Sequence, residues 1–182
     1  MDTSNSMLEP GQEGGTKLQA AVGAARVFLE QLQMPDDRAA LISFNTEANV
    51  VAPLSGDRAA LLAALDGLVT GAGTRIDRGL SVALDELNRE PPQTERNRVV
   101  VMLTDGRTAD VSNEDILATA QTVKDAGILV FTIGLGADVD HVLLAGIATR
   151  PEWYYAATDA GALAGIYRQI AYELPCANID WP

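Results

Sequence analysis

The chain has 182 residues and a net charge of −12, and 47% of its residues are hydrophobic, which is typical of one globular domain that can bury a core without disulfides. The excess of acidic side chains argues against binding to nucleic acid or to an anionic membrane surface, and no apolar run approaches the ~18 residues that span a bilayer. Cys176 and His141 are the only residues of their kinds. A single cysteine excludes an intrachain disulfide and a thiolate cluster. A single histidine leaves few ligands for a zinc site and few groups for histidine-dependent catalysis.

The first half of the chain predicts a helix, a hairpin and two more helices. Apolar residues share one helical face over 18–33, where a proline follows the pattern. Residues 39–44 (AALISF) read as a buried strand, with the weaker segment 48–54 as its hairpin partner. One helix is expected at 57–68, where it begins at an aspartate that can cap it, and another at 74–90, before two prolines.

The second half predicts strands that alternate with helices. Residues 99–103 (VVVML) and 128–135 (ILVFTIGL) lack the polar alternation of a half-exposed strand, as expected for a parallel sheet covered on both faces. A last strand is expected at 152–157. The helices are expected at 113–127, 141–149 and 158–174.

This alternation predicts the fold class. We expect an α/β domain with a doubly wound, Rossmann-like, mostly parallel sheet, one antiparallel edge strand and helices on both faces. The domain should cover residues 1–174. Residues 175–182 match no element and are interpreted as a C-terminal tail.

Three polar segments are predicted to meet at one edge of this sheet, because ligands of open parallel sheets bind outside the carboxyl ends of the strands. They are DTSNS (2–6), GAGTRID (71–77) and LTDGRT (103–108). Each has a plainer interpretation by itself: a disordered chain end, a turn in which Thr74 caps a helix, and a turn in which Asp105 binds its own backbone. Together they offer hydroxyl and carboxylate oxygens, which Mg²⁺ prefers.

The combination of DTSNS, Thr74 in GAGT and Asp105 in LTDG resembles the complete metal-ion-dependent adhesion site of a bacterial-type von Willebrand factor A domain. The resemblance extends over residues 2–174. It implies that the hydroxyls of Ser4, Ser6 and Thr74 bind the cation, with Asp2 and Asp105 binding directly or through water. The implied ion is Mg²⁺, or else Mn²⁺ or Ca²⁺, and an open coordination position would accept an Asp or Glu carboxylate of a protein partner.

The sequence departs from that family at its start. In the family, the DxSxS motif follows a central apolar strand, whereas here only Met1 precedes Asp2. We therefore expect the central strand to be absent, which leaves unpaired backbone groups in the middle of the sheet. Residues 175–182 or a strand from another copy are candidates to fill the place. We interpret the chain as an N-terminally shortened form of a longer protein, and its compartment stays open.

Two other functions remain as alternatives. Asp2 or Asp105 could serve a Mg²⁺-dependent phosphotransfer or hydrolase reaction, but Ser4 stands where such phosphatases place a second carboxylate. No phosphate-binding loop, serine–histidine–aspartate set or nucleophile elbow is present. We therefore predict a binding domain that is not an enzyme. The second alternative is a metal that only braces the loops and captures no partner.

Overall fold

The computed structural model describes residues 1–11, 14–91, 96–106, 108 and 111–174, so the predicted tail at 175–182 lies outside the described residues. The elements, in chain order, are η1 (Asn5–Leu8), α1 (Lys17–Gln31), β1 (Ala39–Phe44), β2 (Ala48–Ser55), α2 (Arg58–Asp66), α3 (Ile76–Asn88), β3 (Arg98–Thr104), α4 (Asn113–Asp125), β4 (Ile128–Leu135), α5 (His141–Ile147), η2 (Pro151–Trp153), β5 (Tyr154–Ala157) and α6 (Ala160–Glu173).

The predicted elements are all present, and one boundary is wrong in an informative way. The last strand was expected to begin at Glu152, but this residue lies in the 3₁₀ turn η2. Pro151 opens that turn, because its fixed φ suits the first position of a helical turn and it has no N–H to donate to a sheet. Trp153, the last residue of the turn, packs against Phe131 with ring centroids 4.4 Å apart.

The strands form two separate sheets. Strands β3, β4 and β5 are parallel, with Val101 opposite Phe131 and Ile133 opposite Tyr155, while β1 and β2 form an antiparallel pair. Among the described residues, β1 and β3 share no ladder of hydrogen bonds. The α/β class is therefore confirmed, and the described residues form no central strand between β1 and β3.

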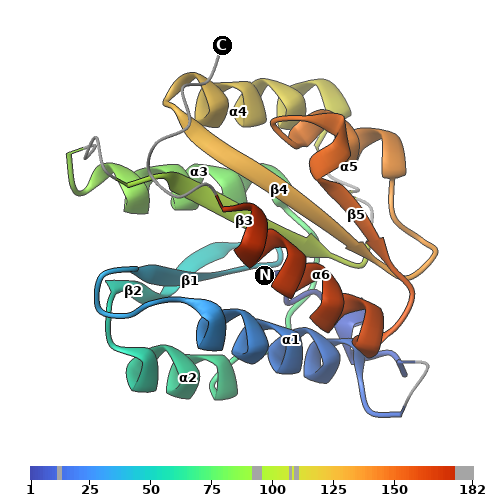
Figure 1. Cartoon of the computed structure of the whole chain (residues 1–182). Helices are drawn as coiled ribbons and strands as arrows, with labels where there is room; N and C mark the ends of the chain where they lie inside the picture. The colour runs from blue at the N-terminus through green and yellow to red at the C-terminus, as the bar shows by residue number, and fades with distance from the viewer. Residues whose placement is uncertain (12–13, 92–95, 107, 109–110, 175–182) are drawn as a thin grey trace.

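Residues 1–3 connect the two sheets at one end of the space between β1 and β3, which we call the slot (Figure 1). The Met1 amine donates to the carbonyl of Ile42 at 2.8 Å, and the Met1 carbonyl accepts from the N–H of Phe44 at 3.1 Å. On the other side, the Asp2 N–H donates to the carbonyl of Leu103 at 2.9 Å. These residues therefore pair as the last residues of a strand parallel to β1 and β3.

The rest of the slot is a cavity of about 580 Å³. Its walls include residues of β1 and β3 and apolar residues from both helical layers, such as Leu29, Leu61, Leu80 and Tyr167. The strands beside it are only partly buried over most of their length, whereas β4 is buried at seven of its eight positions. Burial in the slot lowers the pKa of the Met1 amine to about 6.

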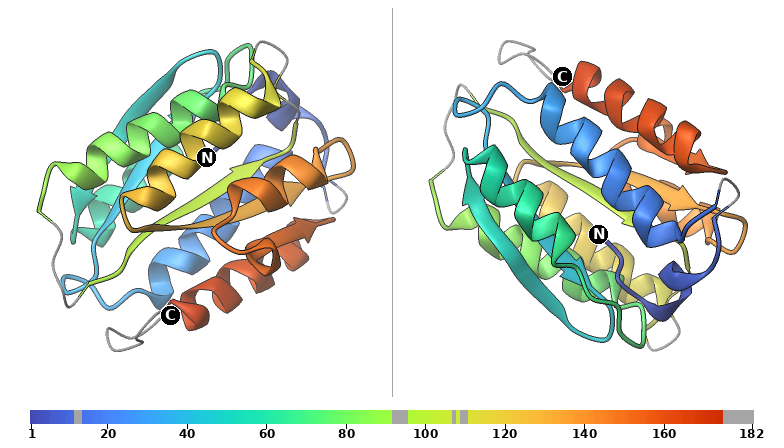
Figure 2. Two further views of the ribbon diagram at one scale, coloured as in Figure 1. Left: turned by 90° about the horizontal axis from the view of Figure 1, so that it is seen from above. Right: turned by 90° about the horizontal axis from the view of Figure 1, so that it is seen from below.

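Helices cover both faces of this arrangement, as predicted. Helices α3, α4 and α5 lie on one face, and α1, α2 and α6 lie on the other (Figure 2). The apolar core is correspondingly split, with Phe131 and Leu163 on the α1–α6 side and Ile116 and Leu144 on the α3–α5 side. The carboxyl ends of β1 and β3 thus project loops to one edge, where the three polar segments meet.

Candidate metal centre

The first polar segment is held rigidly by burial and backbone pairing. Asp2 and Thr3 are fully buried, and Ser4 is 3% exposed, so the interpretation of this segment as a disordered end is wrong. The chain then turns through η1, whose Met7 is fully buried in the core. Met7 serves as an apolar anchor because returning its side chain to water would be costly. It directs the preceding serines toward the edge of the sheet.

The second segment is tied by backbone hydrogen bonds to the first segment and to the turn between β1 and β2. The N–H of Gly71 donates to the carbonyl of Thr3 at 2.8 Å, and the N–H of Thr46 donates to Ala72 at 2.7 Å. Gly73 has φ of +79°, a conformation that favours glycine. Helix α3 begins at Ile76 without a side-chain cap, so Thr74 is not its N-cap. The hydroxyl of Thr74 is therefore not used in capping.

The third segment follows β3 directly. The Thr104 hydroxyl donates to Oδ2 of Asp2 at 2.5 Å and accepts from the N–H of Gly106 at 3.3 Å. The turn is thus held by Thr104, and the Asp105 carboxylate binds side chains from elsewhere in the chain. Its side chain has no exposed surface. A buried carboxylate needs hydrogen-bond donors or a cation beside it, and this one has both.

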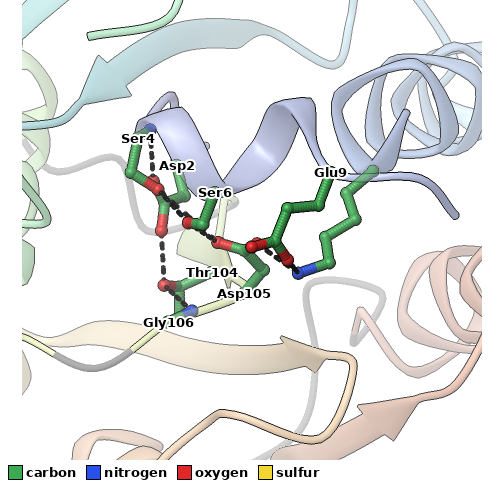
Figure 3. A network of polar contacts seen from close by, with 8 residues as sticks. Asp2, Ser4, Ser6, Glu9, Thr104, Asp105 and Gly106 are labelled. Carbon is green, nitrogen blue, oxygen red and sulfur yellow. Dashed lines mark hydrogen bonds and ion pairs between the residues drawn. The ribbon is translucent and has the colours of Figure 1, made fainter. Parts of the chain in front are cut away.

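Three of the five predicted residues meet in one cluster (Figure 3). The Ser6 hydroxyl donates to Oδ1 of Asp105 at 2.7 Å, and the Ser4 and Ser6 hydroxyl oxygens lie 2.9 Å apart. The Ser4 hydroxyl lies 3.5 Å from the same Oδ1, which is too long for a strong hydrogen bond. Residues 101 positions apart in sequence thus place two hydroxyls and a carboxylate around one point.

The other two predicted residues lie on either side of this cluster. Thr74 lines the same open hollow as Ser6 and Asp105. A methyl group added to Gly106 would lie 3.9 Å from both the Ser6 and the Thr74 hydroxyl oxygens, so these two hydroxyls face the same space beside Gly106. Asp2 lies beneath, where its Oδ1 accepts from the N–H of Ser4 at 2.7 Å.

The Asp2 carboxyl is held in a buried position. Burial raises the pKa of Asp2, although hydrogen bonds from Thr104 and Ser4 act in the opposite direction. Both of its oxygens already accept hydrogen bonds. Asp2 therefore orients the Ser4 backbone and the Thr104 hydroxyl beneath the cluster.

Two charged residues of this edge were not predicted from the sequence. The Lys17 ammonium donates to Oδ2 of Asp105 at 2.8 Å and to Glu9 at 2.7 Å. Burial lowers the pKa of Lys17, but hydrogen bonds to Asp105 and Glu9 outweigh it and raise the pKa overall. Lys17 is the first residue of α1, and a capping box between Thr16 and Gln19 fixes that helix end.

The oxygen set of this cluster fits a hard divalent cation. Hydroxyl and carboxylate oxygens are ligands that Mg²⁺ accepts, usually together with several waters. No group of three His, Cys, Asp or Glu side chains suited to a metal occurs among the described residues. A metal at this edge would therefore depend on hydroxyls for much of its coordination and would keep much of its positive charge.

Comparison with known proteins identifies the family. The sequence model of the von Willebrand factor type A domain matches residues 1–169. An uncharacterised protein of Synechocystis sp. is 29% identical over 144 residues, which are 78% of this chain and 34% of that protein. The chain thus spans about a third of the length of that relative. No helix of the described part is long and apolar enough to cross a membrane.

Solved structures share the fold. A von Willebrand factor type A structure from Catenulispora acidiphila has a TM-score of 0.77 and 25% identity, covering 93% of this chain and 40% of that one. Proximal thread matrix protein 1 of the mussel byssus has a TM-score of 0.79 and 21% identity, covering 93% of this chain and 43% of that one. That second structure is described as having a zinc-occupied MIDAS motif, the abbreviation for a metal-ion-dependent adhesion site.

Proposed function

The chain belongs to the von Willebrand factor type A family, whose members serve adhesion and protein interaction, and we propose that it binds a protein partner through a divalent cation. The cation would be held by Ser4, Ser6 and Thr74, with Asp2 and Asp105 acting directly or through water. The observation that carries this proposal is the 2.7 Å contact between the Ser6 hydroxyl and the buried carboxylate of Asp105, at the floor of an open hollow.

When bound, the cation would supply positive charge that attracts a carboxylate, because hydroxyl ligands neutralise little of it. The proposed ion is Mg²⁺, with Mn²⁺ or Ca²⁺ as alternatives, and the proposed ligand is an Asp or Glu side chain of another protein. Exposed apolar residues lie near the same edge: Leu8 follows Ser6 by two positions, and Val69 precedes Gly71 by two. They support a protein partner, because such residues contribute to interfaces.

The binding experiment is a calorimetric titration of MnCl₂ into metal-stripped protein, with Asp105→Asn as the test variant. Asp125→Asn is the matched control, because it makes the same change at the exposed end of α4. We expect Mn²⁺ binding in the wild type and the control and its loss in Asp105→Asn. Equal binding by all three proteins would contradict the site.

Partner capture needs a second titration, with a short peptide that carries one glutamate and a matched peptide that carries glutamine. We expect the glutamate peptide to bind only when Mn²⁺ is present. A domain whose melting temperature rises with Mn²⁺ but which binds neither peptide would favour the alternative of a metal that only braces the loops. We also propose that the chain is not an enzyme.

A further inference from the structure

A basic side chain, that of Lys17, lies at the same edge as the proposed metal site. The hollow is lined by Ser6, Glu9, Lys17, Thr74, Asp105, Gly106 and Asp138. Among these described residues Lys17 is the only basic one, and the chain has just one other lysine, Lys124. Its side chain is only 14% exposed, so its position here is set by packing and pairing.

The contacts of Lys17 show what its ammonium does. It lies between the exposed carboxylate of Glu9 and the buried carboxylate of Asp105, at 2.7 and 2.8 Å. Asp105 thus has two kinds of partner: Oδ1 receives the Ser6 hydroxyl, and Oδ2 receives the ammonium. A buried carboxylate without a counter-charge would be strongly unfavourable, so the ammonium supplies the positive charge that a metal would otherwise supply.

We propose that Lys17 is a tethered cation that competes with the divalent ion for Asp105 and thereby limits metal affinity. This inference rests on the proposed metal site. A divalent cation on one oxygen of the Asp105 carboxylate would be repelled by the Lys17 ammonium on the other oxygen. Even with the dielectric constant of bulk water, this repulsion is enough to weaken cation binding about tenfold. Lys17 therefore has two opposite effects: it stabilises the metal-free domain and it weakens the metal complex.

These opposite effects separate the proposal from a purely structural role. Replacing Lys17 with methionine keeps much of the aliphatic stem and removes the charge. We expect Lys17→Met to bind Mn²⁺ at least about tenfold more tightly than the wild type, and to melt at a lower temperature in EDTA. A residue that only supported the loops would lower the melting temperature without tightening metal binding.

The experiment is a calorimetric MnCl₂ titration of the wild type, Lys17→Met, Lys17→Arg and Lys124→Met. Lys17→Arg keeps the charge and should not gain affinity. Lys124 donates to the carbonyls of Gly146 and Ala148 at a distant helix end, so its variant should match the wild type. Should Lys17→Met not fold in EDTA, Lys17→Gln provides the same charge removal with a polar side chain.

Two results would overturn the inference in different ways. If the wild type binds Mn²⁺ and neither neutral variant binds it more tightly, Lys17 does not compete with the metal, and the proposed site stands. If no variant and no wild-type protein binds Mn²⁺, the proposed site itself is wrong and the inference is wrong with it. Tighter binding in the neutral variants alone supports the competition.

Discussion

The slot between β1 and β3 leads to a prediction about stability. We predict that an apolar strand joined to the Met1 amine will fill the slot and stabilise the domain. The perturbation is a five-residue extension, Val-Val-Leu-Val-Ile, placed before Met1 behind a charged leader. Because Met1 donates to Ile42 and Asp2 donates to Leu103, alternation along the extension should next satisfy the carbonyls of Val101 and Ala40.

The cavity volume sets the size of the expected effect. At about 24 cal/mol per Å³, a fully empty apolar cavity of this size would lower stability by on the order of 10 kcal/mol. That approaches the whole net stability of an ordinary domain, about 5–15 kcal/mol. Because the cavity opens to solvent and the extension loses conformational entropy, we expect a gain of only about 3 kcal/mol. For a chain of this length that corresponds to about 6–12 °C in the melting temperature.

The assay compares three extensions of equal length by thermal melting and by amide hydrogen exchange. A Gly-Ser extension removes the buried charge of the Met1 amine but cannot pack, and a version with proline at its centre lacks one strand N–H. Only the apolar extension should raise the melting temperature beyond the Gly-Ser control and slow exchange at Ile42 and Val101. An apolar extension that performs no better than Gly-Ser would refute the reasoning that the slot can accept a strand.

Three further predictions concern a helix cap and two buried aromatic side chains. Ser112 caps α4 by accepting from the N–H of Asp115 at 3.1 Å, so Ser112→Ala should lower the free energy of unfolding in urea by about 1 kcal/mol. The control is Ser81→Ala, which should change stability little, because the Ser81 hydroxyl donates to the Asp77 carbonyl within the same helix. Burial raises the pKa of Tyr167, so above about pH 10 the unfolded state loses this proton first and stability falls as pH rises. Tyr167→Phe should make that decline shallower, and the part that remains is expected from Tyr155, whose pKa is also raised by burial. Phe131→Ala should lose about 3–5 kcal/mol, since the ring is fully buried, and an unchanged unfolding midpoint would contradict its place in the core.

Much of the fold was predictable because buried parallel strands leave a direct signature. The apolar runs at 39–44 and 128–135 match β1 and β4 without error, and the caps and prolines around the helices place their ends within a few residues. The meeting of the three polar segments was predictable for a related reason, since ligands of open parallel sheets bind on the loops at the carboxyl ends of the strands.

The chemistry within the site was less predictable. The bond from Lys17 to Asp105 joins residues 88 positions apart, and it depends on how η1 turns after Met7 enters the core. The Thr104 hydroxyl could equally have faced solvent, because a strand-end residue can point to either side of a sheet. Such contacts depend on side-chain packing across elements, which hydrophobic periodicity does not encode.

The slot and the proposed metal site share one segment, so they should be coupled. Residues 1–3 pair with β1 and β3, and Ser4 and Ser6 follow within three residues. A strand that fills the slot would order this segment and lower the entropy lost when a cation gathers its ligands. We predict that the apolar extension tightens Mn²⁺ binding relative to the Gly-Ser extension, in calorimetric titrations of both proteins. By reciprocity of linkage, Mn²⁺ should slow amide exchange at Ile42 by favouring the paired state. Equal Mn²⁺ affinities in the two proteins would mean that the existing bonds to Ile42, Phe44 and Leu103 already order the segment fully.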